Sequence, residues 1–212
     1  MKRLGAIMSF LSLLMLVAAC NDPASNVNRA VTSEAQKAAS PQTAVGQKYG
    51  ITPQNSKIEF IGSKVTGSHN GSFEKFDGEI HYTNNDPVQS HVAIKIDTTS
   101  VKTDDPKLTE HLKTADFFDI AKYPDAKFES TTIKAGGDKG ATHTVTGNLT
   151  LHGVTKSITF PATIAVTGDV ATVDASFAIN RKDFGINYPG AQDNLIRDDV
   201  VMTLRIRGNK AS

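Results

Sequence analysis

The feature that most constrains this chain is a two-residue alternation of apolar and polar side chains that recurs along residues 58 to 206. In SHVAIKID, Val92, Ile94 and Ile96 fall on one face, while Lys95 and Asp97 fall on the other. Successive side chains of a β-strand point to opposite faces of a sheet, so this period predicts strands that are buried on one side. The same pattern recurs in six further segments, which contain Ile58 and Phe60; Ile80 and Tyr82; Val145, Leu149 and Leu151; Ile158 to Val166; Val173 to Ile179; and Val200 to Ile206.

An eighth strand is predicted in AKFESTTIK through Phe128, and turn sequences separate the segments. Gly, Asn, Asp and Pro favour turns because they tolerate or fix unusual backbone angles. They predict turns at HNGS (69–72), TNNDP (83–87), AGGDKG (135–140), HGVTK (152–156) and TGD (167–169). One stretch differs from the rest. In TDDPKLTEHLKTADFFDIAKYP, Asp105 is a helix N-cap before Pro106, which predicts a short helix of about two to three turns.

Seven or eight antiparallel strands that each bury one face must curl into a barrel or split into two packed sheets. A closed barrel leaves no exposed sheet edges. An immunoglobulin-like sandwich fits the alternation equally well, and the absence of Trp and of a second Cys weakens only the antibody type. The alternation alone therefore predicts an all-β domain and leaves barrel and sandwich open.

The N-terminus has the pattern of an export signal. Lys2 and Arg3 precede an apolar run that ends in Ala18, Ala19 and Cys20. Small residues before a Cys resemble a bacterial lipobox, so residues 1–19 are predicted to be a lipoprotein signal peptide and Cys20 the lipid-attachment site. A plain signal peptide or an uncleaved anchor is the alternative, although the run is short for a membrane span. We therefore expect an exported lipoprotein, anchored in a bacterial membrane and facing the periplasm or the cell exterior.

A stretch without sustained periodicity follows the predicted anchor. Residues 20–47 are rich in Ala, Ser, Thr, Gln and Asn, which predicts a lipid-anchored flexible tether. A short amphipathic helix over residues 27–39 is the alternative. Residues 48–210 then form the β-domain, which has the length of one domain and can bury a substantial core.

The charge balance argues against two classes of partner. The chain has 23 Lys and Arg against 22 Asp and Glu, and cleavage before Cys20 would leave 21 against 22. A nearly neutral chain without a clustered basic patch predicts neither nucleic-acid binding nor a polybasic membrane contact. These features do not determine the oligomeric state, and a homodimer remains open.

The residues that are able to carry catalysis or bind a metal show no recognisable arrangement. Asp104, Asp105, Glu110, Asp116 and Asp119 lie around the predicted helix but lack the spacing of a calcium loop. The six His residues have no second His four positions away and no Cys partner, and no G-x-S-x-G sequence occurs. We therefore predict no catalytic residue, no metal site and no cofactor.

Four separate motifs occur in the β-domain: GSFEKFDGEI (71–80), HLKTADFFDIAKYPDAKFES (111–130), GNLTLHGVTKSITF (147–160) and FAINRKDFGI (177–186). Their order and spacing resemble the YceI-like family of bacterial lipid- or polyisoprenoid-binding proteins, and the resemblance covers nearly all of residues 49–208. It implies a lipocalin-like, eight-stranded antiparallel barrel with one short helical excursion, around a long apolar cavity. The alternation by itself predicts only inward apolar side chains, which fill a core as readily as they line a pocket.

The function predicted from this resemblance is non-enzymatic storage, carriage or sequestration of a polyisoprenoid, a quinone or another long-chain lipid in the barrel of the YceI-like domain, residues 48–210. Inward aliphatic and aromatic residues, together with Phe residues near the expected mouth, are the predicted ligand contacts: Phe60, Phe73, Phe76, Ile94, Phe117, Phe118, Phe128, Leu149, Leu151, Phe160, Phe177, Ile179 and Phe184.

Polar residues in GNLTLHGVTKSITF and in INRKDFG are candidates for contacting a phosphate or quinone head group. His152 and Arg181 are the two predicted contacts. The alternatives are that His152 only holds its turn and that Arg181 pairs with Asp183 or Asp116. Two other functions stay open: an enzyme that acts on a lipid or quinone through His152 or Asp116, and a structural or stress-related envelope protein without a ligand.

Overall fold

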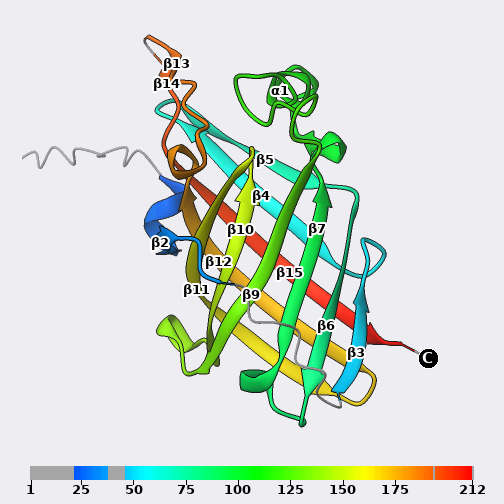
Figure 1. Cartoon of the computed structure of the whole chain (residues 1–212). Coiled ribbons are helices and arrows are strands. Elements are labelled where there is room, and N and C mark those ends of the chain that lie inside the picture. The colour runs from blue at the N-terminus through cyan, green and yellow to red at the C-terminus, as the bar shows by residue number, and fades with distance from the viewer. Residues whose placement is uncertain (1–21, 38–45, 193, 212) are drawn as a thin grey trace, which may run out of the picture.

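The computed structural model describes residues 22–37, 46–192 and 194–211, so the predicted signal peptide and Cys20 lie outside the described residues. The described chain forms an antiparallel barrel with one α-helix, α1 (Pro106–Leu112) (Figure 1). Its strands are β3 (Gly46–Ile51), β4 (Lys57–Lys64), β5 (Gly67–Phe73), β6 (Phe76–Thr83), β7 (His91–Asp97), β8 (Val101–Thr103), β9 (Asp125–Ala135), β10 (His143–Leu151), β11 (Val154–Thr167), β12 (Val170–Asn180) and β15 (Asp199–Lys210).

Eight strand positions close the barrel, because three pairs of consecutive strands each act as one interrupted strand. β3 continues into β4, β5 into β6 and β7 into β8, while β9, β10, β11, β12 and β15 supply the other five positions. β15 completes the circle by pairing with β12 along one edge and with β3 and β4 along the other. The predicted eight-stranded, lipocalin-like barrel is confirmed, and the sandwich alternative is wrong.

Helix α1 begins where the sequence predicts it. The Asp105 side chain accepts hydrogen bonds from the backbone N–H groups of Lys107 (2.7 Å) and Leu108 (3.3 Å), which the first helical turn leaves without partners. Four of the five predicted turns also lie between strands, and each contains a left-handed residue: Asn84, Gly136, Gly153 and Gly168.

The predicted turn at 69–72 is wrong, because HNGS lies inside β5. The chain reverses earlier, between Lys64 and Gly67. Gly71 serves a different purpose from a turn: a Cβ at this position would lie 2.2 Å from Cζ of Phe60. The glycine therefore gives the Phe60 ring room to lie against the neighbouring backbone.

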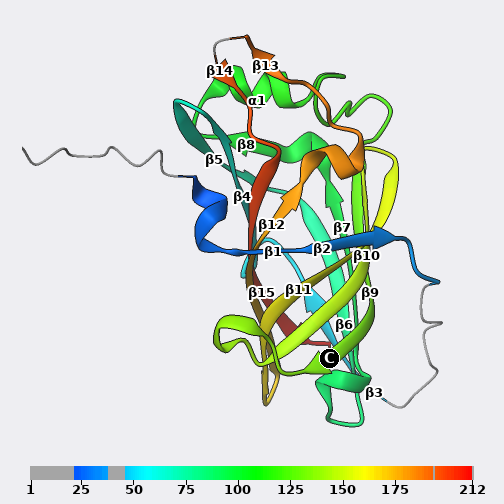
Figure 2. The same ribbon diagram turned by 90° about the vertical axis from the view of Figure 1, so that its left-hand side faces the viewer.

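Residues 22–34, which we name the N-terminal strap, correct the prediction of a flexible tether. The strap consists of η1 (Pro23–Asn26), β1 (Asn28–Arg29) and β2 (Val31–Glu34). β1 pairs with residues 177–178 of β12, and β2 pairs with residues 156–159 of β11. β11 and β12 pair directly only over residues 163–167 and 170–174, so the strap fills the gap between them (Figure 2). Backbone pairing, which polar composition does not reveal, excludes both the free tether and the helix in residues 22–34; residues 38–45 lie outside the described residues.

The barrel has two different ends. The mouth end carries α1, η5 (Arg181–Phe184) and the hairpin of β13 (Gly190–Ala191) and β14 (Asn194–Leu195), together with the β10–β11 turn (Figure 1). The closed end carries η2 (Pro87–Gln89), η4 (Asp138–Gly140) and the β11–β12 turn. The remaining short helix is η3 (Thr98–Ser100), between β7 and β8.

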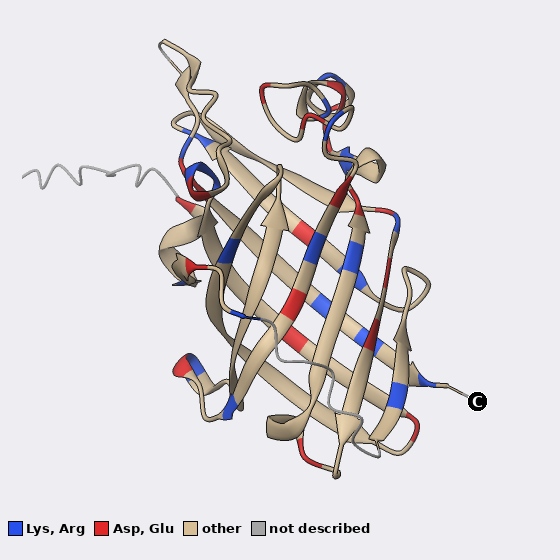
Figure 3. Cartoon of the chain, viewed as in Figure 1, with Lys and Arg blue, Asp and Glu red and all other residues tan. Residues whose placement is uncertain are grey.

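The outer surface mixes both signs of charge. Basic and acidic residues alternate along the strands in the view of Figure 3. This distribution agrees with the near-neutral composition. In the described part of the chain, none of the helices has the length and apolar character needed to span a membrane.

Candidate functional site

A cavity of about 350 Å³ occupies the half of the barrel interior that adjoins the mouth end, which we name the mouth half. Inward side chains of β4, β5, β7, β9, β10, β11, β12 and β15 form its wall. Residues of α1, the loop that follows α1 and the segment 186–196 surround its opening. A volume of this size is typical of sites that enclose a small molecule.

The strand register places the cavity wall in layers. Phe128 of β9 lies directly opposite Ile94 of β7 on one side and Leu149 of β10 on the other. Opposite residues of neighbouring strands share a face, so these three side chains form one inward layer. The rings of Phe128 and Phe160 are 5.8 Å apart, and those of Phe160 and Phe177 are stacked at 4.1 Å. The result is a wall of three neighbouring rings from β9, β11 and β12, with Leu149 of β10 beside Phe128.

A second aromatic group connects the wall to the mouth. The rings of Phe60 and Phe73 are 5.7 Å apart, and Phe73 is 5.7 Å from Phe118 in the loop after α1. His111 of α1 packs edge-on against Phe117 at 5.0 Å and against Tyr188 at 5.1 Å. The loop after α1 is therefore held against the barrel by rings that also line the cavity.

The polar side chains that line the cavity belong to the mouth end, and two of them, Ser63 and Arg181, are buried. The others include Lys64, His69, His111 and Asn194. His69 Nδ1 lies 2.8 Å from a carboxylate oxygen of Asp104. The hydrogen bond from the backbone N–H of Asn70 makes the largest contribution to lowering the pKa of Asp104. The hydrogen bond with His69 lowers this pKa further, while partial burial raises it. A ligand in the cavity would meet hydrocarbon inside and polar groups only toward the mouth end.

Arg181 lines the cavity, but its guanidinium holds the surrounding chain. The side chain is buried, and it donates to the carbonyl oxygens of Ile186 (2.6 Å) and Arg197 (3.1 Å). It also pairs with Asp198 at 3.3 Å, and neither Asp183 nor Asp116 is its partner. Burial lowers the pKa of Arg181, while Asp198 acts in the opposite direction. Its donors are thus directed at the segment that forms the mouth rather than at the cavity.

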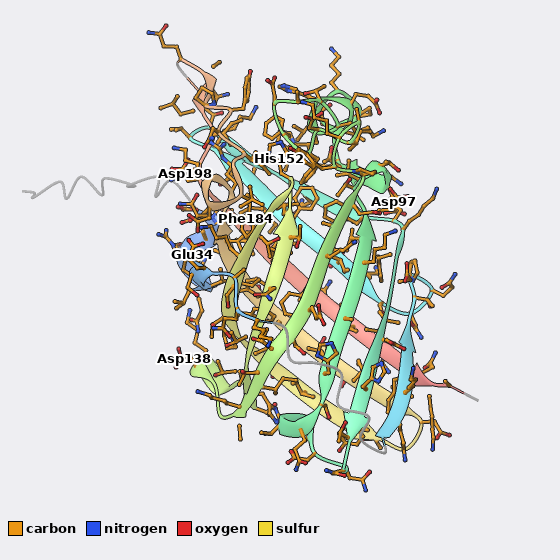
Figure 4. The ribbon with its side chains drawn as sticks, viewed as in Figure 1. Glu34, Asp97, Asp138, His152, Phe184 and Asp198 are labelled. Atoms are coloured by element: carbon orange, nitrogen blue, oxygen red, sulfur yellow. The ribbon has the colours of Figure 1, made fainter. Side chains whose placement is uncertain are left out.

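His152 lies beside the cavity wall rather than in it. Its backbone is left-handed, with φ of 51°, and its Nδ1 lies 3.2 Å from the carbonyl oxygen of Phe184. The ring also packs edge-on against Tyr123 at 5.0 Å. Figure 4 shows His152 and Phe184 together at the mouth end, where they tie the β10–β11 turn to η5. This arrangement supports the interpretation that His152 holds its turn.

The other half of the interior, which we name the closed half, is filled by side chains. Tyr49, Ile51, Ile133 and Val145 are buried there, and none of them lines the cavity. Tyr49 has no exposed surface, and its hydroxyl donates to the carbonyl oxygen of Gly168 at 3.1 Å. The cavity therefore has a solid base.

A comparison with known proteins assigns the chain to a family. The model of the YceI-like domain matches residues 49–207. The chain belongs to the YceI-like family. A UPF0312 protein of Pseudomonas putida is 40% identical over 136 residues, which are 61% of this chain and 70% of the relative. A UPF0312 protein of Pseudomonas fluorescens is 37% identical over the same length.

Solved structures share the fold of this YceI-like domain. BcnA of Burkholderia cenocepacia aligns with a TM-score of 0.66 at 24% identity, covering 74% of this chain and 98% of BcnA. A polyisoprenoid binding domain of Saccharophagus degradans, implicated in plant cell wall breakdown, aligns with a TM-score of 0.61 at 18% identity, covering 78% and 99%. The YCEI protein of Campylobacter jejuni aligns with a TM-score of 0.58 at 23% identity, covering 67% and 85%.

Most of the predicted contact residues of the YceI-like domain lie on the cavity wall. Phe76, His152 and Phe184 do not line the cavity: Phe76 is buried where β6 begins, and Phe184 is completely buried behind the mouth. The structure brings together the others around one space: Phe60, Phe73, Ile94, Phe117, Phe118, Phe128, Leu149, Leu151, Phe160, Phe177, Ile179 and Arg181. Their contact with a ligand stays a prediction.

Sequence reasoning missed two kinds of wall residue. The first kind was detectable, because it lies on the inward face of strands with clear alternation: Ile58, Ile96, Ile158, Val200, Met202 and Leu204. The second kind lies in the irregular mouth of the YceI-like domain and has no periodic signal: Leu108, His111, Ile186, Tyr188 and Ile196. Only the folded chain brings this second kind to the cavity.

The described residues contain no group of three or more His, Cys, Asp or Glu side chains placed to hold a metal ion. The two His and Asp pairs at the mouth, His69 with Asp104 and His111 with Asp116, are separate from each other, and each joins one ring nitrogen to one carboxylate oxygen at 2.8 Å. Asp116 lies 2.8 Å from His111 Nε2 and is not itself a lining residue.

Proposed function

We propose that this protein binds a long-chain apolar lipid of the polyisoprenoid or quinone class in the mouth half of its barrel, without chemical conversion, while a lipid on Cys20 anchors it to a bacterial envelope membrane. The observation that carries the proposal is a cavity of about 350 Å³ with an aromatic and aliphatic wall, a packed base and polar lining residues only toward its mouth end. The ligand is therefore an amphiphile that enters tail first.

The energetics of such a site favour a hydrocarbon tail. Each methylene group transferred from water into an apolar cavity contributes about 0.8 kcal/mol. A tail of several isoprene units then has ample gross driving force without any ionic contact. Because the Arg181 guanidinium is occupied by carbonyl oxygens and Asp198, a charged head group gains little by entering the interior and stays at the mouth.

Two further observations support this proposal. The Saccharophagus degradans domain, which shares the fold, is a polyisoprenoid binding domain. The export pattern of residues 1–19, which ends before Cys20, predicts a location where envelope lipids are available.

The experiment that tests the proposal is extraction of bound lipid. The full chain is expressed in a bacterial host, purified in mild detergent, extracted with organic solvent and examined by mass spectrometry. Leu149→Trp fills the cavity from the last part of β10, and Leu149→Met is its volume-conserving control. We expect lipid in the parent protein and in Leu149→Met, and at least a tenfold smaller yield in Leu149→Trp. Lipid-free parent protein, or equal yields from all three folded proteins, would contradict the proposal.

A further inference from the structure

The N-terminal strap is fastened to the mouth. Asp22, the first described residue, pairs with Arg197 at 3.3 Å. Arg197 follows Ile196, which lines the cavity. Further along the strap, Arg29 pairs with Asp199, and the backbone N–H of Ala30 donates to the carbonyl oxygen of Ala178 at 2.8 Å. The start of the strap is thus held beside the residues that form the opening.

This attachment shortens the anchor. A flexible tether over residues 20–47 would let the barrel take any orientation on a membrane. Because the strap is paired with β11 and β12, only the segment from Cys20 to Asp22 separates a lipid on Cys20 from the barrel. Two residues span at most about 7 Å. The covalent chain therefore keeps an anchored mouth end close to the membrane surface.

The mouth end also exposes apolar side chains. Val65 and Leu195 are 53% and 51% exposed. Val65 lies at the tip of the β4–β5 hairpin, and Leu195 lies in β14, opposite Gly190 of β13. The β4–β5 tip is joined to β14, because the backbone N–H of Val65 donates to the carbonyl oxygen of Leu195 at 3.2 Å, and the Thr66 hydroxyl donates to the Asn194 side chain at 2.8 Å. Val65 and Leu195 together form a small exposed apolar surface beside the opening, which we name the wedge. Exposed aliphatic side chains of this kind favour insertion into a lipid interface.

We propose that the mouth end is a membrane-docking surface, with Val65 and Leu195 inserted in the lipid interface and the cavity opening directed at the bilayer. The inference rests on the lipid anchor of the proposed function. In this orientation the hydrocarbon tail of a ligand passes from the bilayer into the cavity through the mouth, and the closed end points away from the membrane.

Single cysteines measure this orientation, since Cys20 is the only natural cysteine and the lipid blocks its thiol. Val65→Cys and Leu195→Cys report on the wedge. Val88→Cys is the matched control, because Val88 is also exposed, at 42%, but lies in η2 at the closed end. Each full-length, lipidated variant is labelled with a polarity-sensitive fluorophore and reconstituted in vesicles of phosphatidylethanolamine and phosphatidylglycerol that contain nitroxide-labelled acyl chains.

We expect strong quenching and a blue shift at positions 65 and 195, and neither at position 88. Equal quenching at both ends, quenching only at position 88, or a mass spectrum that shows no lipid on Cys20 would overturn the docking surface. Lipid extraction is carried out on the same samples. Bound lipid together with unquenched positions 65 and 195 rejects the orientation and supports the carrier function. Quenched positions 65 and 195 on protein without bound lipid support the orientation and reject the carrier function.

A second measurement tests the role of the wedge in transfer. In the double variant Val65→Asp, Leu195→Asp, both changes are at exposed positions, so the fold is preserved. We expect transfer of a fluorescent prenyl lipid from the protein to acceptor vesicles to slow by roughly tenfold, because the charged wedge no longer enters the interface. Val88→Asp is the control and should transfer at the parent rate. Transfer that is equally fast in the double variant contradicts the docking surface.

Discussion

The mouth half and the closed half of the barrel share the same eight strand positions, but only the mouth half is hollow. The closed half is filled by residues such as Tyr49, Ile133 and the small Ala162. The mouth half carries larger side chains, including the stacked rings of Phe160 and Phe177, and still encloses a cavity. Small side chains therefore do not create the space.

The difference lies in the circumference of the wall. In the closed half, β11 and β12 pair directly. In the mouth half they separate, and the N-terminal strap occupies a ninth position beside Ile158 and Phe177, both of which line the cavity. Barrel diameter increases with the number of strands. We infer that the strap widens the mouth half and thereby makes room for a ligand.

Removal of the N-terminal strap should abolish the difference between the two halves, and it should change stability more than the other variants. A soluble chain that begins at Ala38 loses the paired strands β1 and β2 that a chain beginning at Asn21 retains. At about 0.5 to 1.5 kcal/mol per backbone hydrogen bond, we expect a loss of roughly 3 kcal/mol or more in the free energy of unfolding. Chemical denaturation of both chains measures it.

Amide hydrogen exchange identifies which residues of the barrel lose stability when the strap is removed. Amides of residues 156–159 and 177–178, which adjoin the strap, should lose protection in the shortened chain. Amides of residues 163–167, where β11 pairs directly with β12, should keep it. A uniform loss of protection would mean that the strap supports the whole barrel rather than the mouth half.

A matched pair of isoleucine substitutions compares the packing of the closed half with that of the mouth half. Ile133→Ala in the closed half leaves a new void and should cost about 2 to 5 kcal/mol in the free energy of unfolding. Ile94→Ala removes a similar buried side chain from the wall of an existing cavity, where fewer packing contacts are lost, and should cost about half as much. Urea denaturation of both ligand-free variants and of the parent protein measures the two losses in the free energy of unfolding. Equal costs would contradict the contrast between a packed and a hollow half.

His152→Ala tests whether His152 contacts the ligand or only holds the β10–β11 turn in place. The change removes the contact with the Phe184 carbonyl and the packing on Tyr123. We expect a loss of about 1 kcal/mol in stability and no change in the amount of bound lipid. Thermal unfolding and lipid extraction measure the two quantities. A variant with normal stability but no bound lipid would make His152 a ligand contact.

The acid sensitivity that Asp104 contributes at the mouth should be the smallest effect. The pKa of Asp104 is lowered in the folded state, chiefly by the backbone N–H of Asn70, so its contribution to stability is present above the unfolded pKa of about 3.9. The contribution is lost as the pH falls through the folded pKa. Because Asp104 is largely exposed, we expect about 0.5 kcal/mol or less. Asp104→Asn should remove that part of the acid sensitivity; an unchanged profile would contradict this assignment.

The regular part of the fold was predictable because alternation and burial coincide. Ile94 and Ile96 in β7 and Met202 and Leu204 in β15 form one inward face in the sequence pattern, and they line the cavity. The capping residue Asp105 likewise indicates from the sequence alone where α1 begins. The presence of a cavity was different: it followed from the family resemblance, since inward apolar residues alone do not distinguish a packed from a hollow interior.

The irregular parts were not predictable, for two physical reasons. The strap and β5 are held mainly by backbone pairing, which leaves no apolar period; Val31 in β2 even points to solvent, with 68% of its surface exposed. The mouth depends on contacts between distant segments, such as His111 against Tyr188 and Arg181 against the Ile186 carbonyl. Neither kind of contact has a local signature in the sequence.

The most direct test of the account is a crystal structure of the protein purified from a bacterial host with its bound lipid retained. We predict continuous hydrocarbon density along Phe128, Phe160 and Phe177, ending above the packed residues Ile133 and Val145, with the head group at the mouth near His69 and Asn194. A mouth half filled by its own side chains or by ordered water alone would contradict the account.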